Sequence, residues 1–169
     1  VWLALELGAK SDISGLILFV MGIPVILISL IVGVMSDHMN RRTLLVVSQA
    51  GALAITIVIA WMVTTGNITI SWAIVGSFIS GIFIAIGSPV RSAIVPSIVP
   101  SDKLVGAIAV NTIGSNLGLM IGPATAGPAI AAWGIEGAFW LQAAMHLIGF
   151  IALIQLRLPP SVNLQRRRM

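Results

Sequence analysis

Two polar residues near the end of the chain could exchange a proton or bind a polar ligand. Gln142 and His146 lie four residues apart in an apolar stretch, so on a helix they share one face. An imidazole exchanges protons near neutral pH, and an amide both donates and accepts hydrogen bonds. Two interpretations stay open: a pair that lines a cavity, or a neutral His146 bonded to a neighbouring helix.

Three further amides lie in apolar stretches and pose the same question. Asn111 and Asn116 are candidate cavity-lining residues, and Gln49 is a similar isolated amide. A polar side chain within a membrane helix either hydrogen-bonds a neighbouring helix or contacts a ligand, and interhelical bonding is the commoner case.

Other kinds of chemistry are excluded by what the chain lacks. It has no cysteine, and its two histidines, His38 and His146, are far apart in sequence, so neither a thiolate nor a zinc site is expected. There are no paired carboxylates within the apolar stretches, no H-E-x-x-H and no nucleophile with a nearby base. We therefore expect no enzyme, no catalytic residue, no metal and no cofactor.

The composition is that of a membrane protein. Of 169 residues, 58% are hydrophobic and only 8% are charged, and the mean hydropathy is +1.09. So few charges could not keep a domain of this size soluble in water, where about 25% is usual. The net charge of +4 does not indicate nucleic acid here, because the positions of basic residues matter more than their sum.

Charged residues and turns divide the chain into membrane spans. A bilayer core of about 30 Å requires roughly 20 helical residues. The long uncharged stretch between Arg42 and Arg91 therefore holds two spans, separated by the turn residues at 64–67. Residues 1–7 are interpreted as the end of a helix whose start lies upstream. The complete predicted spans are 13–36, 43–64, 68–90, 104–126 and 137–156.

The basic residues predict the orientation of these spans. Eight of the nine Lys and Arg residues fall on one side of the alternating topology, and only Lys10 falls on the other. The positive-inside rule places segments 37–42, 91–103 and 157–169 in the cytoplasm. The sequence thus predicts a multi-pass protein of the cell (inner or plasma) membrane.

Small residues recur at helical spacing inside two spans. Gly114, Gly118 and Gly122, followed by Ala126, form one stripe, and Ser77, Gly81 and Ala85 form another. Such stripes let two helix backbones approach closely. Prolines within the spans should kink or end their helices; these are Pro24, Pro123 and Pro128.

The segment from Gly33 to Arg42 resembles a known signature. Its sequence is GVMSDHMNRR, and the major facilitator superfamily carries G-x-x-x-D-[RK]-x-G-R-[RK] between its second and third helices. Gly33, Asp37, Arg41 and Arg42 match. His38 replaces a basic residue, and Asn40 replaces Gly, which is a mild change because Asn also tolerates positive φ.

A second motif resembles an element of the antiporter branches of that superfamily. The segment from Gly118 to Gly127 reads GLMIGPATAG and is similar to G-x-x-x-G-P-x-x-G-G, with Gly122, Pro123 and Gly127 matching and Ala126 replacing a Gly. The run from Ser88 to Leu104 is similar to drug and siderophore exporters of the group containing the enterobactin exporter. Leu119 stands where that group often has an Arg.

The resemblance implies an all-α fold, a polytopic membrane helix bundle that forms the N-terminal six-helix half of a major facilitator and lacks most of its first helix. Residues 1–156 would form this bundle and 157–169 would begin the central cytoplasmic loop. The implied partners are the lipid bilayer, the missing C-terminal half, a small-molecule substrate and protons. The implied function is proton-coupled efflux of a drug-like or siderophore-like molecule by alternating access. The alternative is a helical membrane scaffold that binds partners and transports nothing.

The cytoplasmic signature also implies a conformational latch. Asp37, Arg41 and Arg42 would join Arg91 and Asp102 in a charge cluster at the cytoplasmic helix ends, and the latch would close that side in one transport state. A solvated surface ion pair is the alternative.

Overall fold

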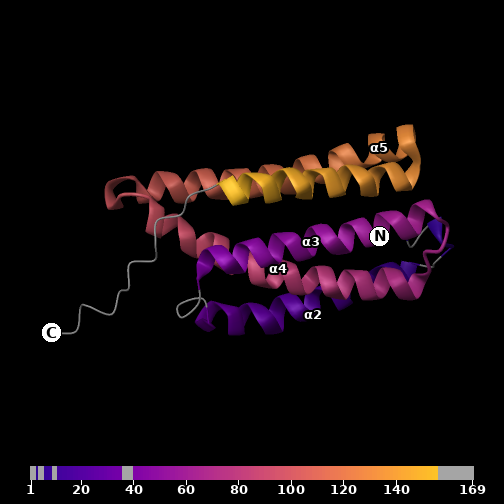
Figure 1. Cartoon of the computed structure of the whole chain (residues 1–169), viewed down its shortest axis with the longest axis horizontal. Helices are drawn as coiled ribbons and strands as arrows, with labels where there is room; N and C mark the ends of the chain where they lie inside the picture. The colour runs from indigo at the N-terminus through magenta and orange to yellow at the C-terminus, as the bar shows by residue number, and fades with distance from the viewer. Residues whose placement is uncertain (1–2, 4–5, 9–10, 36–39, 156–169) are drawn as a thin grey trace.

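The computed structural model describes residues 3, 6–8, 11–35 and 40–155, and within these residues every regular element is a helix (Figure 1). The elements are α2 (Ser11–Met35), α3 (Arg41–Thr64), α4 (Ile70–Ile98), the short 3-10 helix η1 (Ser101–Lys103) and α5 (Leu104–Gln155). In the described part, four helices are long and apolar enough to cross a membrane. The predicted all-α membrane bundle is confirmed.

The element α5 consists of two helices that meet at Gly134. This residue has φ 71° and ψ 179°, a conformation open to glycine and strained for other residues. In Figure 1 the chain runs out along α5 and returns beside itself after this point. We call residues 104–133 the first half of α5 and residues 135–155 the second half. At 52 residues, α5 has the length of two membrane crossings.

The predicted turn at residues 64–67 is confirmed, and its hydrogen bonds explain where α3 ends. Gly66 adopts φ 69°, and its N–H donates to the carbonyl of Val63, while the N–H of Asn67 donates to the carbonyl of Met62. This paired arrangement is the Schellman motif, which satisfies carbonyls left free at a helix end. The next helix begins at once, with the Thr69 hydroxyl accepting from the N–H of Trp72.

Asn40 begins α3 as an N-cap. Its side chain accepts a hydrogen bond from the N–H of Arg42 at 3.0 Å, and its φ is −68°. Asn40 therefore does not adopt the positive φ that a glycine at this position would allow. Asn is among the best N-cap residues, which gives the replacement of Gly in the signature a local physical reason.

Glycines bring α2, α3 and α4 close together. A Cβ on Gly81 would collide with the backbone carbonyl of Met21 on α2, so the predicted close approach at this stripe is confirmed. Between α3 and α4, a Cβ on Gly87 would lie 2.9 Å from Ser48 Oγ, and one on Gly76 would lie 2.8 Å from Ile59 Cδ1.

Two apolar clusters occupy the interior at different levels of the bundle. One joins Leu3 near the N-terminus with residues of all four long helices, namely Ile17, Ile59, Ala73 and Ile135. The other contains Val32, Leu45, Val90 and Ile94 from α2, α3 and α4. Many remaining large apolar side chains are exposed, as expected for surfaces that face lipid.

Two helices extend further than we expected. Residues 91–98, which we assigned to a cytoplasmic loop, form the last two turns of α4, with Pro89 and Pro96 inside the helix. The error arose because we ended the span at the first charge, whereas a helix can continue beyond the apolar core. Neither Pro123 nor Pro128 ends α5; its break falls at Gly134.

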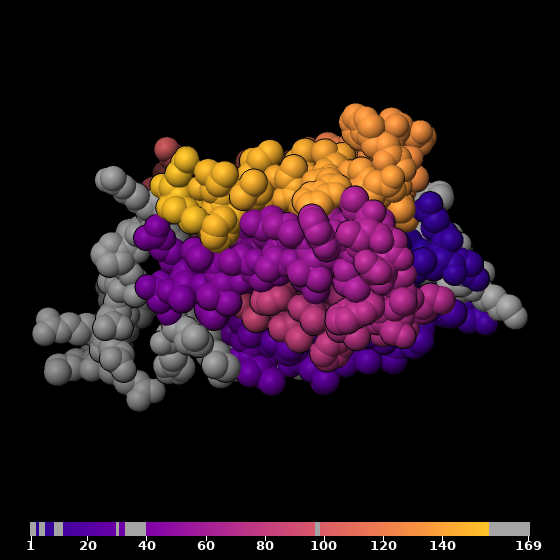
Figure 2. Space-filling model, turned by 45° about the vertical axis from the view of Figure 1, so that its right-hand side comes forward, coloured from indigo at the N-terminus to yellow at the C-terminus, as the bar shows by residue number. Residues whose placement is uncertain are grey.

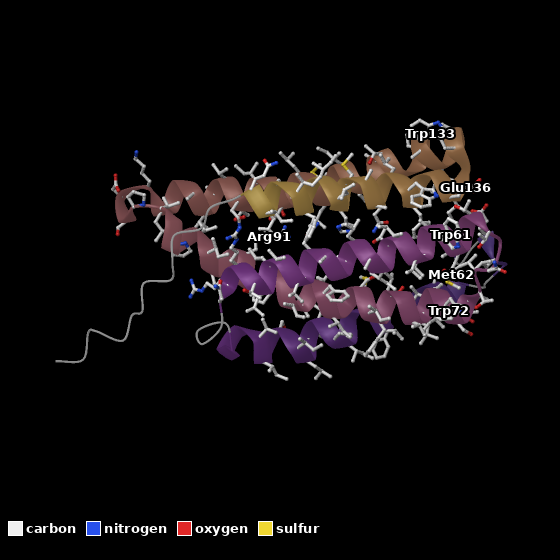
Figure 3. All side chains as sticks on the ribbon, in the orientation of Figure 1. Trp61, Met62, Trp72, Arg91, Trp133 and Glu136 are labelled. Carbon is white, nitrogen blue, oxygen red and sulfur yellow. The ribbon has the colours of Figure 1, made fainter. Side chains whose placement is uncertain are left out.

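Tryptophans mark one end of the bundle. Trp61, Trp72 and Trp133 gather there in Figure 3, and all three are exposed. Trp140 joins the same end by donating from Nε1 to Thr64 Oγ1 at 3.0 Å. Arg91 lies toward the opposite end (Figure 3). Tryptophan is enriched at membrane interfaces, so this end is suited to the lipid headgroup level.

Candidate functional site

The first candidate site is a polar contact between α3 and the second half of α5. The Gln49 Nε2 atom donates to the backbone carbonyl of His146 at 3.1 Å and lies 3.2 Å from Nδ1 of the same residue. Of the two interpretations of His146, bonding to a neighbouring helix is the one found. Figure 2 shows the second half of α5 lying along α3, which is the packing that brings these residues together.

Gly149 makes room for this contact. A Cβ at this position would stand 3.1 Å from Gln49 Nε2, which is tighter than ordinary packing. Gln142, which we paired with His146 from their spacing, is exposed and does not share in the contact with Gln49. The spacing rule placed both residues on one side of the helix, but His146 alone meets α3.

The other two candidate amides differ from each other. Asn111 is half-buried and lines an open groove of about 580 Å³ between the end of α4 and the start of α5. The groove is mostly apolar, and its other lining residues are Val95, Val99, Lys103, Gly106, Ala107 and Val110. Asn116 is exposed.

The second candidate site is the signature at residues 33–42, where two arginines bind backbone carbonyls of other helices. Arg41 Nη1 donates to the carbonyl of Ala93 on α4 at 2.7 Å, and Arg42 Nη2 donates to the carbonyl of Ile154 on α5 at 3.1 Å. Ile154 is in the last described turn of α5. A cation there also interacts favourably with the helix dipole. The two arginines at the start of α3 thus donate hydrogen bonds to α4 and α5.

The remaining latch residues are not joined to this cluster in the described part of the chain. Arg91 is exposed on α4, Asp102 is exposed in η1, and neither forms an ion pair with a described residue. Gly33 lies in α2, whereas Asp37 lies outside the described residues. The latch stays a prediction.

The glycine stripe of α5 has no neighbour in the described structure. A Cβ on Gly114, Gly118, Gly122 or Gly127 would meet no atom within 4 Å, and Pro123 is exposed beside them. The first half of α5 is exposed around most of its surface. Its role in packing is therefore also still a prediction.

Sequence reasoning missed two contributors to these sites. The space that Gly149 leaves for Gln49 and the bond from Trp140 to Thr64 were not predicted. A small residue one turn after His146 was the available signal for the first, since a polar side chain from another helix needs room. The bond from Trp140 to Thr64 had only a weaker signal in the sequence, namely that a buried indole N–H usually needs an acceptor.

Comparison with known proteins identifies the family. Residues 1–168 match the family model described as Major Facilitator Superfamily. The chain is 24% identical over 156 residues to a staphyloferrin A transporter of Staphylococcus aureus, covering 92% of this chain and 39% of that protein. It is also 24% identical over 163 residues to YfiS of Bacillus subtilis, an uncharacterized transporter of the same superfamily, covering 96% and 37%.

The chain spans less than two fifths of the length of these curated relatives, and no solved structure matches it. The family match nevertheless covers nearly every residue and agrees with the apolar helices and the cytoplasmic signature. The relatives are named as transporters, not as enzymes. The chain is a multi-pass membrane protein that belongs to the Major Facilitator Superfamily.

Proposed function

We propose that the chain is the N-terminal half of a secondary transporter that exports a small drug-like or siderophore-like molecule by proton-coupled alternating access. The observation that carries this proposal is the family match over residues 1–168. The relative named as a staphyloferrin A transporter supports a siderophore-like substrate. We also propose that the protein lies in the cell membrane, that a second half completes it, and that protons drive the transport.

The uncovered surface of α5 is consistent with a chain that needs further helices. Its glycines meet nothing within 4 Å in the described residues, although such stripes serve close helix packing. In the proposed transporter, helices from the rest of the protein cover this face. The groove beside Asn111 would then become part of the interior.

Transport by the complete protein tests this proposal. The purified protein is placed in liposomes with an imposed proton gradient, and movement of a fluorescent cationic dye and of an iron-labelled siderophore is followed. We expect one of them to move against its own gradient only when the proton gradient is present. Movement that is unaffected by a proton-conducting ionophore would contradict the coupling.

A variant with an intact membrane bundle supplies the control. Ser101→Cys changes an exposed residue of η1 and should leave transport unchanged until a bulky maleimide is attached. If neither probe moves while the protein remains folded, the scaffold interpretation is favoured instead. Pull-down of a stable partner from the same membranes would then support that alternative.

A further inference from the structure

The contact between Gln49 and His146 depends on the tautomer and the protonation state of the histidine. The backbone carbonyl of His146 can only accept, so the Gln49 atom 3.1 Å from it must be the amide nitrogen. That same nitrogen lies 3.2 Å from Nδ1 of His146. Since an amide nitrogen can only donate, this second contact is a hydrogen bond when the imidazole is neutral with its proton on Nε2 and Nδ1 bare.

We propose that Nδ1 of His146 is a proton-binding site whose occupation breaks the contact between α3 and the second half of α5. A proton on Nδ1 would place two donors 3.2 Å apart. Turning the Gln49 amide to offer its oxygen would put that oxygen against the carbonyl of His146 instead. Either arrangement loses one of the two hydrogen bonds, so neutral His146 locks the helices together and the protonated form releases them.

Among the described residues, the side chain that bonds to His146 from another helix is the uncharged amide of Gln49. The charged residues of the elements that pack against this part of α5, and of α5 itself, are Arg41, Arg42, Arg91, Asp102, Lys103 and Glu136. In the described structure, Arg41 donates to the carbonyl of Ala93 and Arg42 to that of Ile154, while Gln49 bonds to His146. Arg42 contacts Ile154, eight residues further along, which is about 12 Å along a helix. Glu136 precedes His146 by ten residues, or about 15 Å.

The apolar surroundings make the contact sensitive to protonation of His146. Both residues are half-buried within apolar helices, where few other hydrogen-bond partners are available. The lock itself rests on geometry alone. Its use in transport, as a step in which proton binding loosens α5 from α3, rests on the proposed function.

Thermal unfolding of the complete protein in detergent tests the lock without a transport assay. Between about pH 8 and about pH 5, where histidine titrates, the midpoint should fall by about 2–4 °C as one interhelical hydrogen bond is lost. In His146→Asn, the side-chain oxygen can still accept from Gln49 but cannot be protonated. This variant should lose that pH dependence.

The other histidine of the chain provides the matched control. The His38→Asn variant should keep the full pH dependence. The Gln49→Ala variant should lose it, as the His146→Asn variant does. An unchanged pH dependence in His146→Asn, or none in the parent protein, would overturn the proposal. These results do not depend on whether the protein transports anything.

Magnetic resonance of isotope-labelled histidine covers the case in which a variant fails to fold. With His146 identified by pairwise isotope labelling with the preceding Met145, its ring should show a bare Nδ1 and a protonated Nε2 at high pH, and two protonated nitrogens at low pH. The opposite tautomer at high pH would contradict the proposed site.

Discussion

At the scale of single residues, the arginines of the signature at residues 33–42 bind backbone carbonyls. Arg41 reaches Ala93 at 2.7 Å in a half-buried position, and Arg42 reaches Ile154 at 3.1 Å in an exposed one. A guanidinium has several donors in a fixed plane and keeps its charge at all ordinary pH values. It can therefore donate to a backbone carbonyl of a neighbouring helix at any ordinary pH.

The two arginines should differ in their contribution to stability. Arg41→Ala should lower the free energy of unfolding by about 1.5–3 kcal/mol, the range for hydrogen bonds to charged groups. Arg42→Ala should cost about 0.5–1.5 kcal/mol, because water can replace its exposed contact. Thermal unfolding in detergent measures both, with Arg41→Lys as a control that keeps the charge and one donor. Equal losses for the two alanine variants would contradict the ranking.

At the scale of helices, the two small-residue stripes have different surroundings. The stripe of α4 is covered, since Gly81 lies against the backbone of Met21. The stripe of α5 faces open space. The same sequence pattern thus marks a contact within the described bundle in one case and an open face of the described bundle in the other.

Bulky substitutions can show whether the α5 stripe is covered in the complete protein. Gly118→Val or Gly122→Val should destabilise it by about 1–3 kcal/mol if another helix packs there. Leu117→Val, on a different face, should cost less, and Gly81→Val should be disruptive in any case because it meets backbone. The measurement is thermal unfolding in detergent. Equal losses for Gly118→Val, Gly122→Val and Leu117→Val would mean that the stripe faces lipid.

At the scale of the whole molecule, the chain alternates between two membrane faces. Ser11 begins α2, whereas Ser101 follows α4 near the end that Arg41 binds. The chain has no cysteine, so a cysteine introduced into it is the single thiol of this chain. Ser11→Cys should react with an impermeant maleimide from outside the cell, and Ser101→Cys only after permeabilisation. The reverse labelling would overturn the predicted orientation.

The proposed latch also belongs to the whole molecule, because its partner would lie in the other half of the transporter. In the complete protein, Asp37→Asn should reduce transport while membrane abundance stays nearly normal. A reduction of roughly tenfold corresponds to about 1.4 kcal/mol, a reasonable value for a charge-assisted hydrogen bond. Transport rates in liposomes and immunoblots of membranes give the two measurements. Normal transport by this variant would leave only a solvated surface pair.

Local chemistry was sufficient to predict the class of the protein and several helix limits. Low charge and high hydropathy require a membrane environment whatever the fold is. The turn at Gly66 depends on a glycine and its immediate neighbours, so it could be read directly from the sequence. The continuation of α4 to Ile98 could not be read from the sequence in this way. Hydropathy shows which residues can lie in the apolar core of the bilayer, but it does not show where the backbone hydrogen bonds of the helix end.

Tertiary packing alone decided which polar and small residues have partners. Gln49 and His146 are 97 residues apart, and their contact requires α3 and α5 to meet at one depth and one rotation. The covered state of Gly81 and the open state of Gly118 likewise depend on which helix lies beside each. Composition and spacing determine that a helix forms and which of its faces is polar or small. The neighbour of that face is set by the side-chain packing of several helices at once, so only the folded structure reveals it.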